Sequence, residues 1–399
     1  MLLKRKQFIQ LGSLATASLL LPKFMKAFET PAWVPPGNKV LVVLQLSGGN
    51  DGLNTVIPVT NDLYYSARPR LGIKKEEALS LTTDAGLHPS LTAFKDLFDA
   101  GHLGIMNSVG YPNPDRSHFR SMDIWQTASN SNQYLSNGWL GRYLDAQCQG
   151  CDKPVQALEI DDVLSLSLKG EKTNGIAMRD PRRLYNTSHE KYFKDLLAQH
   201  QQPATERPAD YLYKTMASTL SSADYIFEQS KLRPSTAQYP STGLGQSLKT
   251  IASLIFSDIS TKVYYVSLGS FDTHVGQEGQ QKRLFTEMND AVKSFVADLQ
   301  ANHRFEDVLM MTFSEFGRRV SQNASGGTDH GTANNMFFVG GGLKQQGLLN
   351  ALPALDQLQE GDLQHTVDFK DVYATVLRNW LQADDKLILG KRSQYLNFV

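Results

Sequence analysis

An almost uninterrupted apolar segment, KVLVVLQL at residues 39–46, restricts the possible folds of this chain more than any other feature. The glycine-rich sequence SGG at residues 47–49 ends it. A strand without polar alternation is buried on both faces, and such strands occur in parallel sheets that helices cover on both sides. The segment therefore predicts a central strand of an α/β domain.

Four later segments have the same strand character, and amphipathic helical patterns separate them. We expect these strands at residues 103–109, 262–268, 307–313 and 336–339, and helices at 90–100, 284–299 and 369–381. Because strands and helices alternate, the sequence predicts a doubly wound, mostly parallel sheet in a single domain spanning residues 39–399. A polar helical stretch at about 185–245 predicts a helical insertion in that domain.

The composition excludes several classes of protein. The 399 residues include 40 basic and 40 acidic side chains, so the formal net charge is zero. Proteins that bind nucleic acid by neutralising phosphates concentrate positive charge, and we therefore expect no nucleic-acid partner. The two cysteines, Cys148 and Cys151, are too few for a disulfide-dense scaffold or a four-cysteine zinc site. We expect them to form a local disulfide.

The first 28 residues have the pattern of an export signal. A basic start precedes an apolar run at residues 11–21, which is short for a bilayer crossing. Arg5-Lys6 resembles the twin-arginine export motif with lysine in the second position. We expect a signal peptide at residues 1–28, a proline-rich spacer at 29–38 and a location in the periplasm or cell envelope. The export route stays open, and an uncleaved signal that tethers the protein to the membrane is the alternative.

Carboxylates and histidines collect directly after the predicted strands. The candidates are Asp51, Asp272, His274, Glu315, Asp329 and His330. Ligands of parallel sheets bind outside the carboxyl ends of the strands. Carboxylate and imidazole groups together are ligands of divalent metal ions. The sequence therefore predicts a metal site at this edge of the sheet, with one or two ions of zinc, manganese or calcium.

Four of these six candidates also have an ordinary structural interpretation, and the glycine-flanked pair Asp329-His330 is harder to explain in that way. Asp51 lies in a glycine-rich turn, where aspartate caps helices and bonds to its own backbone. Asp272 with its neighbouring histidine fits a plain loop pair. Glu315 could be an ion-pair partner of Arg318 or Arg319, a type of contact that contributes little when exposed.

The segment Arg116-Ser117-His118 follows the second predicted strand and begins a helix. Serine at a helix start is a common capping residue. The same place favours a nucleophile, because the positive end of the helix stabilises negative charge. In that interpretation Arg116 holds an anionic group and His118 acts as acid, base or ligand. A serine esterase built on Ser47 is disfavoured, because no Gly-x-Ser-x-Gly elbow is present.

Eight motifs occur together along the chain. They are LQLSGGNDGLN at 44–54, LHPSL at 87–91, RSHF at 116–119, GWLGR at 138–142, FDTH at 271–274, FSEFGR at 313–318, DHG at 329–331 and DFKDVYAT at 368–375. In combination, and with the basic signal start, they resemble the exported bacterial proteins grouped as domain of unknown function 1501. That family is similar in overall plan to the alkaline phosphatase and sulfatase superfamily. The resemblance implies a doubly wound α/β fold with a binuclear metal centre that cleaves phosphate or sulfate esters.

The resemblance implies a role for each acid that follows the first and fourth strands. Asp51 matches the aspartate that binds the metal next to the nucleophile. Glu315 stands where an Asp-His pair supplies the same metal, and Phe316 occupies the place of that histidine. No cysteine or serine stands at the expected nucleophile position, and Ser117 is the nearest hydroxyl.

The resemblance also implies the ligands of the other metal. Asp272 and His274 are similar to its Asp and His ligands, with a shorter spacing than is usual. His330 resembles the last histidine ligand, and Asp329 precedes it.

These residues together predict an exported metal-dependent hydrolase that acts on a small anionic phosphate or sulfate ester. A divalent ion would polarise the ester, and Arg116 or Arg318 would neutralise its negative charge. Ser117 or a water molecule would attack. The alternative is a non-catalytic envelope protein of the same fold that binds a ligand or a partner. Phe316 and the unusual nucleophile position favour the alternative, and the preserved carboxylates and histidines favour catalysis.

Overall fold

The computed structural model describes residues 39–147, 155–193, 195, 208–390 and 394–399. The expected signal peptide, the spacer and the pair Cys148 and Cys151 lie outside these residues. Lys39–Val399 forms one compact unit. Within the described part of the chain, no helix has both the length and the apolar character that a membrane span requires.

A nine-stranded sheet forms the centre of this unit, with the order β11-β5-β10-β9-β1-β8-β6-β7 and β14 paired to β5. Its strands are β1 (Val40–Leu46), β5 (Leu103–Gly110), β6 (Ala157–Glu159), β7 (Ile176–Ala177), β8 (Val263–Leu268), β9 (Val308–Phe313), β10 (Asn334–Val339), β11 (Gly347–Leu348) and β14 (Val367–Asp368). β1 lies between β8 and β9 and is parallel to both. The five strands expected from the sequence are β1, β5, β8, β9 and β10, and the mostly parallel sheet is confirmed.

One strand of the sheet, β10, runs in the opposite direction. It is antiparallel to both β5 and β9. The start of β10 therefore lies at the edge where β1, β8 and β9 end. As a result, the connection at residues 314–333 stays at this edge and does not cross the sheet.

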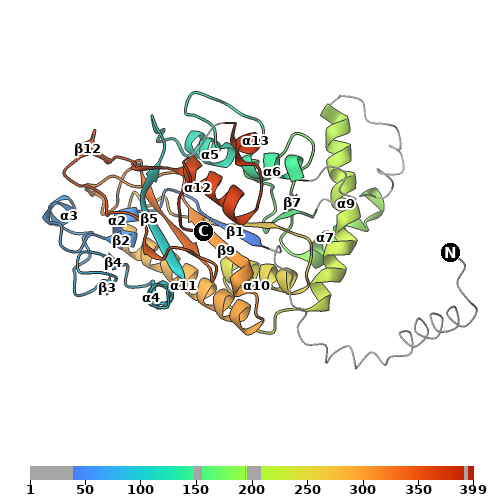
Figure 1. The fold of residues 1–399 in the computed structure, drawn as a ribbon, viewed down its shortest axis with the longest axis horizontal. Helices are drawn as coiled ribbons and strands as arrows, with labels where there is room; N and C mark the ends of the chain where they lie inside the picture. Colours follow the sequence, from blue (N-terminus) through green and yellow to red (C-terminus); the bar gives the residue numbers. More distant parts are fainter. Residues whose placement is uncertain (1–38, 148–154, 194, 196–207, 391–393) are drawn as a thin grey trace, which may run out of the picture. The chain divides into compact units, whose positions relative to one another are not determined.

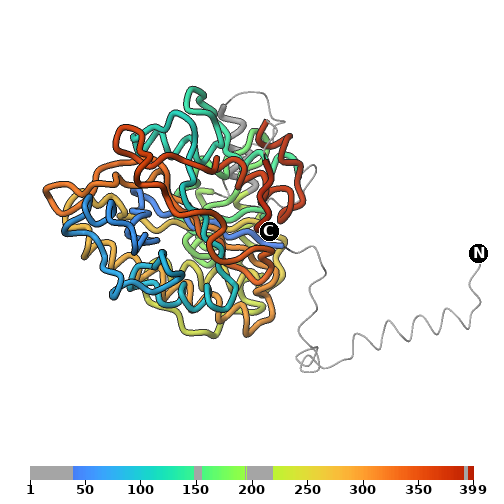
Figure 2. The backbone as a smooth tube through the Cα atoms, turned by 60° about the vertical axis from the view of Figure 1, so that its left-hand side comes forward, coloured from blue at the N-terminus to red at the C-terminus, as the bar shows by residue number. Residues whose placement is uncertain are grey.

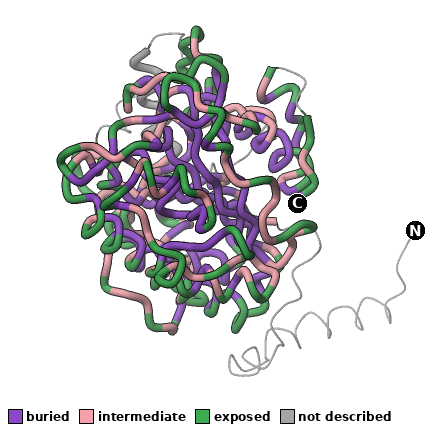
Figure 3. Tube along the Cα trace, turned by 90° about the vertical axis from the view of Figure 1, so that its left-hand side faces the viewer, coloured by how far each residue is buried: buried purple, intermediate pink, exposed green. Residues whose placement is uncertain are grey.

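The two faces of the sheet are covered by different helices, as β1 illustrates. Val42 and Leu44 point into a core with α4 (Thr92–Asp99), α10 (Gly243–Phe256) and α11 (Gln277–Ala301). Leu41 and Val43 point into a second core with α5 (His118–Thr127), α6 (Trp139–Gln147) and α12 (Phe369–Thr375). Figure 1 shows the two helical layers on opposite sides of the strands. Figure 3 shows the buried residues concentrated along the sheet between them. Burial on both faces explains the uninterrupted apolar sequence of β1.

The remaining helices and short strands lie outside the nine-stranded sheet. The helices are α2 (Gly52–Thr55), α3 (Asp62–Ala67), α7 (Pro181–Ser188), α9 (Pro208–Leu232) and α13 (Asp385–Leu389). The short strands are β2 (Val56–Ile57), β3 (Leu79–Ser80) and β4 (Gly86–Leu87) in one small sheet, and β12 (Leu358–Gln359) with β13 (Asp362–Leu363) in another. α7 and α9, in the stretch expected as a helical insertion, pack against each other.

Loops from distant parts of the sequence meet at the carboxyl edge of the sheet, where β1 from the start of the domain lies among strands from its second half (Figure 2). Two glycines allow their close approach. Gly48 and Gly49 have φ angles of +118° and +78°, which favour glycine. A Cβ atom on Gly48 would lie 2.4 Å from the backbone nitrogen of Asp272. The glycines of this loop therefore bring the segments after β1 and β8 into contact.

Candidate metal centre

Three histidines and one aspartate converge at this edge. His118 begins α5, Asp272 and His274 follow β8, and His330 precedes β10. The Nε2 atoms of His274 and His330 are 2.9 Å apart. Asp272 Oδ1 lies 3.1 Å from Nε2 of His274 and 3.3 Å from Nε2 of His330. Asp272 Oδ2 lies 3.5 Å from Nε2 of His118.

The other ring nitrogen of each histidine, Nδ1, faces an oxygen acceptor. For His118, His274 and His330 these acceptors are Glu315 Oε1 at 2.8 Å, Asp329 Oδ1 at 3.1 Å and the backbone oxygen of Arg116 at 2.8 Å. A carboxylate or a carbonyl accepts hydrogen bonds and does not donate them, so Nδ1 carries the proton of each neutral ring. All three Nε2 atoms consequently keep their lone pairs, and these lone pairs face the same space as the Asp272 carboxylate.

This arrangement fits a divalent cation. Two lone pairs at 2.9 Å, as in His274 and His330, repel each other unless a positive charge lies between them. The Nε2 atom of His118 is buried and has no hydrogen-bond partner among the described residues. The ligand atoms of His118, Asp272 and His330 lie within 4.8 Å of one another. His118, His330 and Asp272 offer imidazole nitrogens and a carboxylate, which are donors typical of zinc, and each Nδ1–H is held by an oxygen. His274 lies next to two members of this group, His330 and Asp272.

The charges around the cluster keep Asp272 ionised. Burial alone would raise the pKa of its carboxyl group, but hydrogen bonds and positive charge from Arg318, with help from His330 and His274, lower the pKa to about 2. The hydrogen bond to Glu315 raises the pKa of His118. Burial lowers the pKa of His330, which favours its neutral, metal-binding form.

Two residues expected as metal ligands, Glu315 and Asp329, contact the histidines instead. The buried carboxylate of Glu315 accepts hydrogen bonds from His118 Nδ1 and from the backbone nitrogen of Gly48, each at 2.8 Å. Its described contacts do not include an ion pair with Arg318. Asp329 is more exposed and accepts from His274. Both acids fix the orientation of an imidazole ring, as the residues around the ligands of a metal site commonly do.

Asp51 is not brought into the histidine cluster. Its Oδ1 caps α2 by accepting from the backbone nitrogen of Leu53 at 3.2 Å. Its Oδ2 accepts from Arg68 Nη1 at 2.6 Å and from Gln277 Nε2. The side chains of Asp51 and Arg68 are almost entirely buried. Both oxygens of this carboxylate are thus occupied by protein donors, and the helix-capping interpretation describes its position.

A chain of hydrogen bonds nevertheless links Asp51 to the centre. Gln277 donates to Asp51, and its Oε1 accepts from the hydroxyls of Thr273 at 3.2 Å and Thr328 at 2.6 Å. Thr273 lies between two residues of the cluster, and Thr328 is two residues before His330. Asp51 therefore helps to position both loops that carry cluster residues. No sequence motif indicated Arg68, which is far from the cluster residues in sequence, or Gln277, which follows His274 by three residues at the start of α11.

The side chain of Arg318 connects three loops at the carboxyl edge of the sheet by hydrogen bonds. Its fully buried guanidinium donates to the backbone oxygens of Gly49 at 2.6 Å, Thr328 at 2.9 Å and Phe271 at 3.0 Å. It also contacts Asp272 Oδ1 at 2.8 Å. These contacts hold three loops together and orient the aspartate. A guanidinium in this position is not accessible to a substrate anion, which was one of its expected roles.

The predicted nucleophile segment lies at the rim of the cluster. Ser117 is the N-cap residue of α5, but its hydroxyl makes no capping hydrogen bond and its side chain is exposed. Arg116 is 36% exposed, and its Nη2 pairs with Asp362. The ring of Phe316 packs against His118 and His330, with ring centroids 4.9 and 4.7 Å apart. Phe316 thus supports the imidazoles, and Ser117 and Arg116 are accessible.

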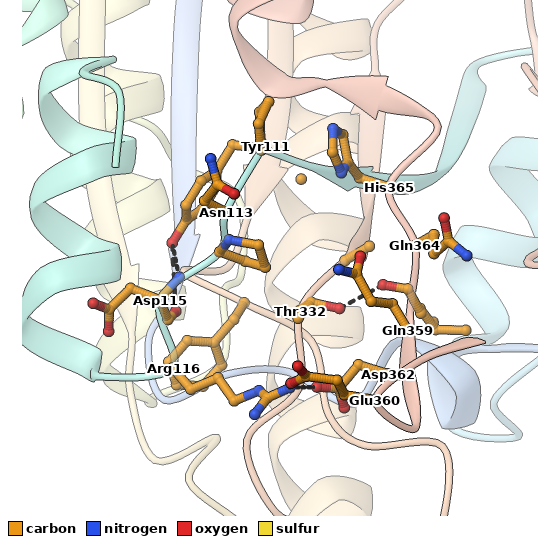
Figure 4. A pocket seen from close by; sticks show the side chains of 16 residues that line it. Tyr111, Asn113, Asp115, Arg116, Thr332, Gln359, Glu360, Asp362, Gln364 and His365 are labelled. Carbon is orange, nitrogen blue, oxygen red and sulfur yellow. Dashed lines mark hydrogen bonds and ion pairs between the residues drawn. The ribbon is translucent and has the colours of Figure 1, made fainter. Parts of the chain in front are cut away.

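A cavity of about 620 Å³ lies next to the cluster, and Arg116 and Phe316 are part of its wall. Figure 4 shows polar side chains from the segment after β5, from the segment just before β10 and from the β12–β13 hairpin around this space. A concave site with convergent polar groups beside the cluster is where a small ligand would bind.

Several solved structures are similar in fold to this chain. The lipoteichoic acid synthase LtaP from Listeria monocytogenes is 10% identical, with a TM-score of 0.42 over 90% of this chain and 76% of that one. The PsFucS1 sulfatase from Pseudoalteromonas sp. is 11% identical, with a TM-score of 0.40 over 90% and 70%. The C-terminal periplasmic domain of EcEptC from Escherichia coli, in complex with Zn, is 11% identical, with a TM-score of 0.35 over 76% and 74%.

No curated protein matches the sequence. A family model described as "Protein of unknown function (DUF1501)" matches residues 100–395, which include every residue of the histidine cluster. The match covers well over half of the chain and confirms the resemblance seen in the motifs. The chain therefore belongs to the DUF1501 family.

Proposed function

We propose that this protein is an exported, zinc-dependent hydrolase of phosphate or sulfate esters. The observation that carries the proposal is the convergence of three histidine Nε2 atoms on the Asp272 carboxylate. The fold places this cluster at the carboxyl edge of the sheet, where ligands of α/β domains bind. The accessible Ser117 and Arg116 at its rim supply a hydroxyl and a positive charge.

The donor set favours zinc among the ions considered from the sequence. His118, His274, His330 and Asp272 offer three nitrogens and one carboxylate, whereas calcium prefers oxygen ligands only. One ion fits better than two. The carboxylate that would serve a second ion, Asp51, is neutralised by Arg68 at 2.6 Å. A bound zinc ion would polarise the ester and stabilise the negative charge that develops on it.

The protein groups divide the remaining tasks. Glu315 and Asp329 hold two imidazoles in their ligand tautomer, and Arg318 orients Asp272. We assign Arg116 to the ester anion, because its Nε and Nη1 groups make no hydrogen bond with the described residues and its side chain faces the cavity. Ser117 is the proposed nucleophile, and a water molecule is the alternative.

Elemental analysis and turnover test this proposal together. The purified protein should contain about one zinc ion per chain and hydrolyse 4-nitrophenyl phosphate or 4-nitrophenyl sulfate. His330→Ala should lose both zinc and turnover. The matched control His303→Asn alters an exposed histidine in a left-handed conformation that asparagine tolerates, and it should lose neither. A protein that turns over esters equally well without bound metal would refute the proposal.

Ser117→Ala separates the two possible nucleophiles. Loss of turnover with full zinc content would support attack by the serine hydroxyl. Unchanged turnover would assign attack to water. One zinc ion with no turnover on either ester class would favour the other candidate, an envelope protein that uses the centre to bind a ligand. The packing of Phe316 on His118 and His330 is compatible with that candidate.

A further inference from the structure

The cavity adjoins the histidine cluster through Phe316, whose ring lines the cavity and packs on His118 and His330. Arg116 lines the cavity and His118 follows two residues later, while Thr332 lines the cavity two residues after His330. Two residues of extended chain span at most about 7 Å. A molecule in the cavity therefore has one end within reach of the histidine cluster. In an ester substrate, that end is the phosphate or sulfate and the remainder is the alcohol.

One wall residue of the cavity, Asp362, has an unsatisfied oxygen. Its side chain is 1% exposed, and its Oδ2 is held by Arg116 Nη2. Its Oδ1 is buried and has no hydrogen-bond partner among the described residues. Arg319 Nε is 3.7 Å from Oδ1, which is too far for a hydrogen bond. A buried acceptor without a donor is costly, and a ligand hydroxyl in the cavity would satisfy it.

The charge of the cavity wall disfavours an anionic ligand. The wall contains one guanidinium, that of Arg116, and three carboxylates, those of Asp115, Glu360 and Asp362. A leaving group with further phosphates or sulfates would be repelled by these acids. The anionic end of the substrate therefore belongs between Arg116 and the metal centre, and the rest of the cavity is left for an uncharged or cationic group.

The neutral side chains of the wall distinguish these two possibilities. Asn113 and Gln359 direct amide groups toward the cavity (Figure 4), and neither has a side-chain hydrogen bond to another described residue. Amides both donate and accept hydrogen bonds, which matches the hydroxyl groups of a polyol. A quaternary ammonium is usually recognised by several aromatic faces, whereas Tyr111 and Phe316 are the aromatic residues of this wall.

We propose that this cavity binds the alcohol part of the ester and that this alcohol is a neutral polyol of the sugar class. Asp362 Oδ1 accepts a hydrogen bond from one of its hydroxyls. The ester linkage rests on the proposed hydrolase function, but the sugar binding does not. In the overall reaction the bond between phosphorus or sulfur and the sugar oxygen breaks. Water supplies the new oxygen on phosphorus or sulfur, and the sugar leaves with one proton of that water.

The first test compares leaving groups on the zinc-loaded protein. The probes are glucose 6-phosphate, phosphocholine and 4-nitrophenyl phosphate, together with the three corresponding sulfates. We expect kcat/KM for the glucose ester to exceed that for the choline ester at least tenfold. A preference for the choline ester, or equal rates for both, would overturn the proposal.

Two substitutions connect this preference to the cavity. Asp362→Asn keeps one oxygen for Arg116 and replaces the unpaired acceptor by an NH₂ donor. It should lower kcat/KM for the glucose ester about tenfold more than for the nitrophenyl ester. Gln359→Ala, at an exposed position where folding is not at risk, should shift the same ratio about threefold. The control Asp99→Asn alters a surface carboxylate and should leave the ratio unchanged. If neither cavity variant changes the ratio, the proposal is wrong.

A binding measurement keeps this proposal separate from the hydrolase function. Neutral oligosaccharides on an array, probed with the zinc-loaded protein, should bind the native chain and bind Asp362→Asn and Gln359→Ala more weakly. Sugar binding without hydrolysis of any ester would refute the hydrolase and leave the sugar site intact. Ester hydrolysis with no sugar binding and an unchanged substrate ratio would refute the sugar site and leave the hydrolase intact.

Discussion

Asp51 and Asp272 follow neighbouring parallel strands, β1 and β8, but their surroundings differ. Asp51 is buried against Arg68, a permanent cation of this chain, at 2.6 Å. Asp272 is half-exposed and faces three imidazoles as well as Arg318. One carboxylate has all of its acceptor capacity filled by the protein, and the other faces lone pairs that need a cation. A strand-end acid can therefore serve as a metal ligand only where the fold leaves its carboxylate facing other potential ligands, as it does for Asp272.

A third acid, Glu159, ends β6, the strand next to β8. It accepts a hydrogen bond from the backbone nitrogen of Ser165 at 2.6 Å. Burial raises the pKa of its carboxyl group to about 7. Burial without strong compensation by a cation or by solvent thus keeps the carboxyl group of Glu159 protonated to a higher pH than usual.

The largest expected effect on stability comes from breaking the buried ion pair of Asp51 and Arg68. Asp51→Ala leaves Arg68 buried without its counter-charge and should lower the free energy of unfolding by about 3–5 kcal/mol. Urea denaturation of the metal-free protein measures this. The double substitution Asp51→Ala with Arg68→Met should be less destabilised than the sum of the single variants, because no lone charge remains. Additive losses would show that the pair is not coupled.

The dependence of the free energy of unfolding on pH should reveal the contribution of Glu159. Its folded pKa of about 7 lies above the ordinary value of 4.5, so the folded state binds the proton more tightly than the unfolded state. This group should therefore lower stability as pH rises between these two values, by about 3 kcal/mol in all. Glu159→Gln should remove this loss, so that the variant is more stable than the native chain at pH 8 and similar at pH 4. An equal stability difference at both pH values would contradict the assignment.

The two aspartates should differ sharply in metal binding. Asp272→Asn removes the anionic donor and should weaken zinc affinity at least about 100-fold, beyond the loss typical of a residue that only supports a ligand. Asp51→Asn should retain about one zinc ion per folded chain, because Arg68 rather than a metal neutralises this site. Competition with a chromophoric chelator measures both affinities. Equal losses in the two variants would mean that Asp51 is a ligand.

The smallest effect on zinc binding should come from substituting Glu315 and Asp329, the two acids that accept hydrogen bonds from histidine Nδ1 atoms. Glu315→Gln should weaken zinc binding about 10-fold, since it removes the negative charge that orients and polarises His118. Asp329→Asn should weaken it less, because this carboxylate is more than half exposed and solvent screens it. The same chelator competition ranks the two variants. A larger loss of zinc affinity in Asp329→Asn than in Glu315→Gln would show that Asp329 contributes more to zinc binding than Glu315 does.

Five of the strands, and the edge of the sheet that carries the site, were predictable from sequence. The apolar runs at β1, β5, β8, β9 and β10 identify strands because burial on both faces excludes polar side chains. Asp272, His274 and His330 were identified because unusual polar residues followed these runs. The antiparallel direction of β10 was not predicted, since an apolar run carries no information about strand direction.

The sequence by itself determined which chemical groups reach the carboxyl edge of the sheet, because strand periodicity and chain order fix where each strand ends. Only the tertiary structure decided what each group does there. Arg68 is paired with Asp51, His118 completes the cluster, and Asp362 faces the cavity through contacts between residues far apart in the chain. Electrostatic partners act over a few ångströms in space, and no local pattern in the sequence records which partner folding brings within that distance.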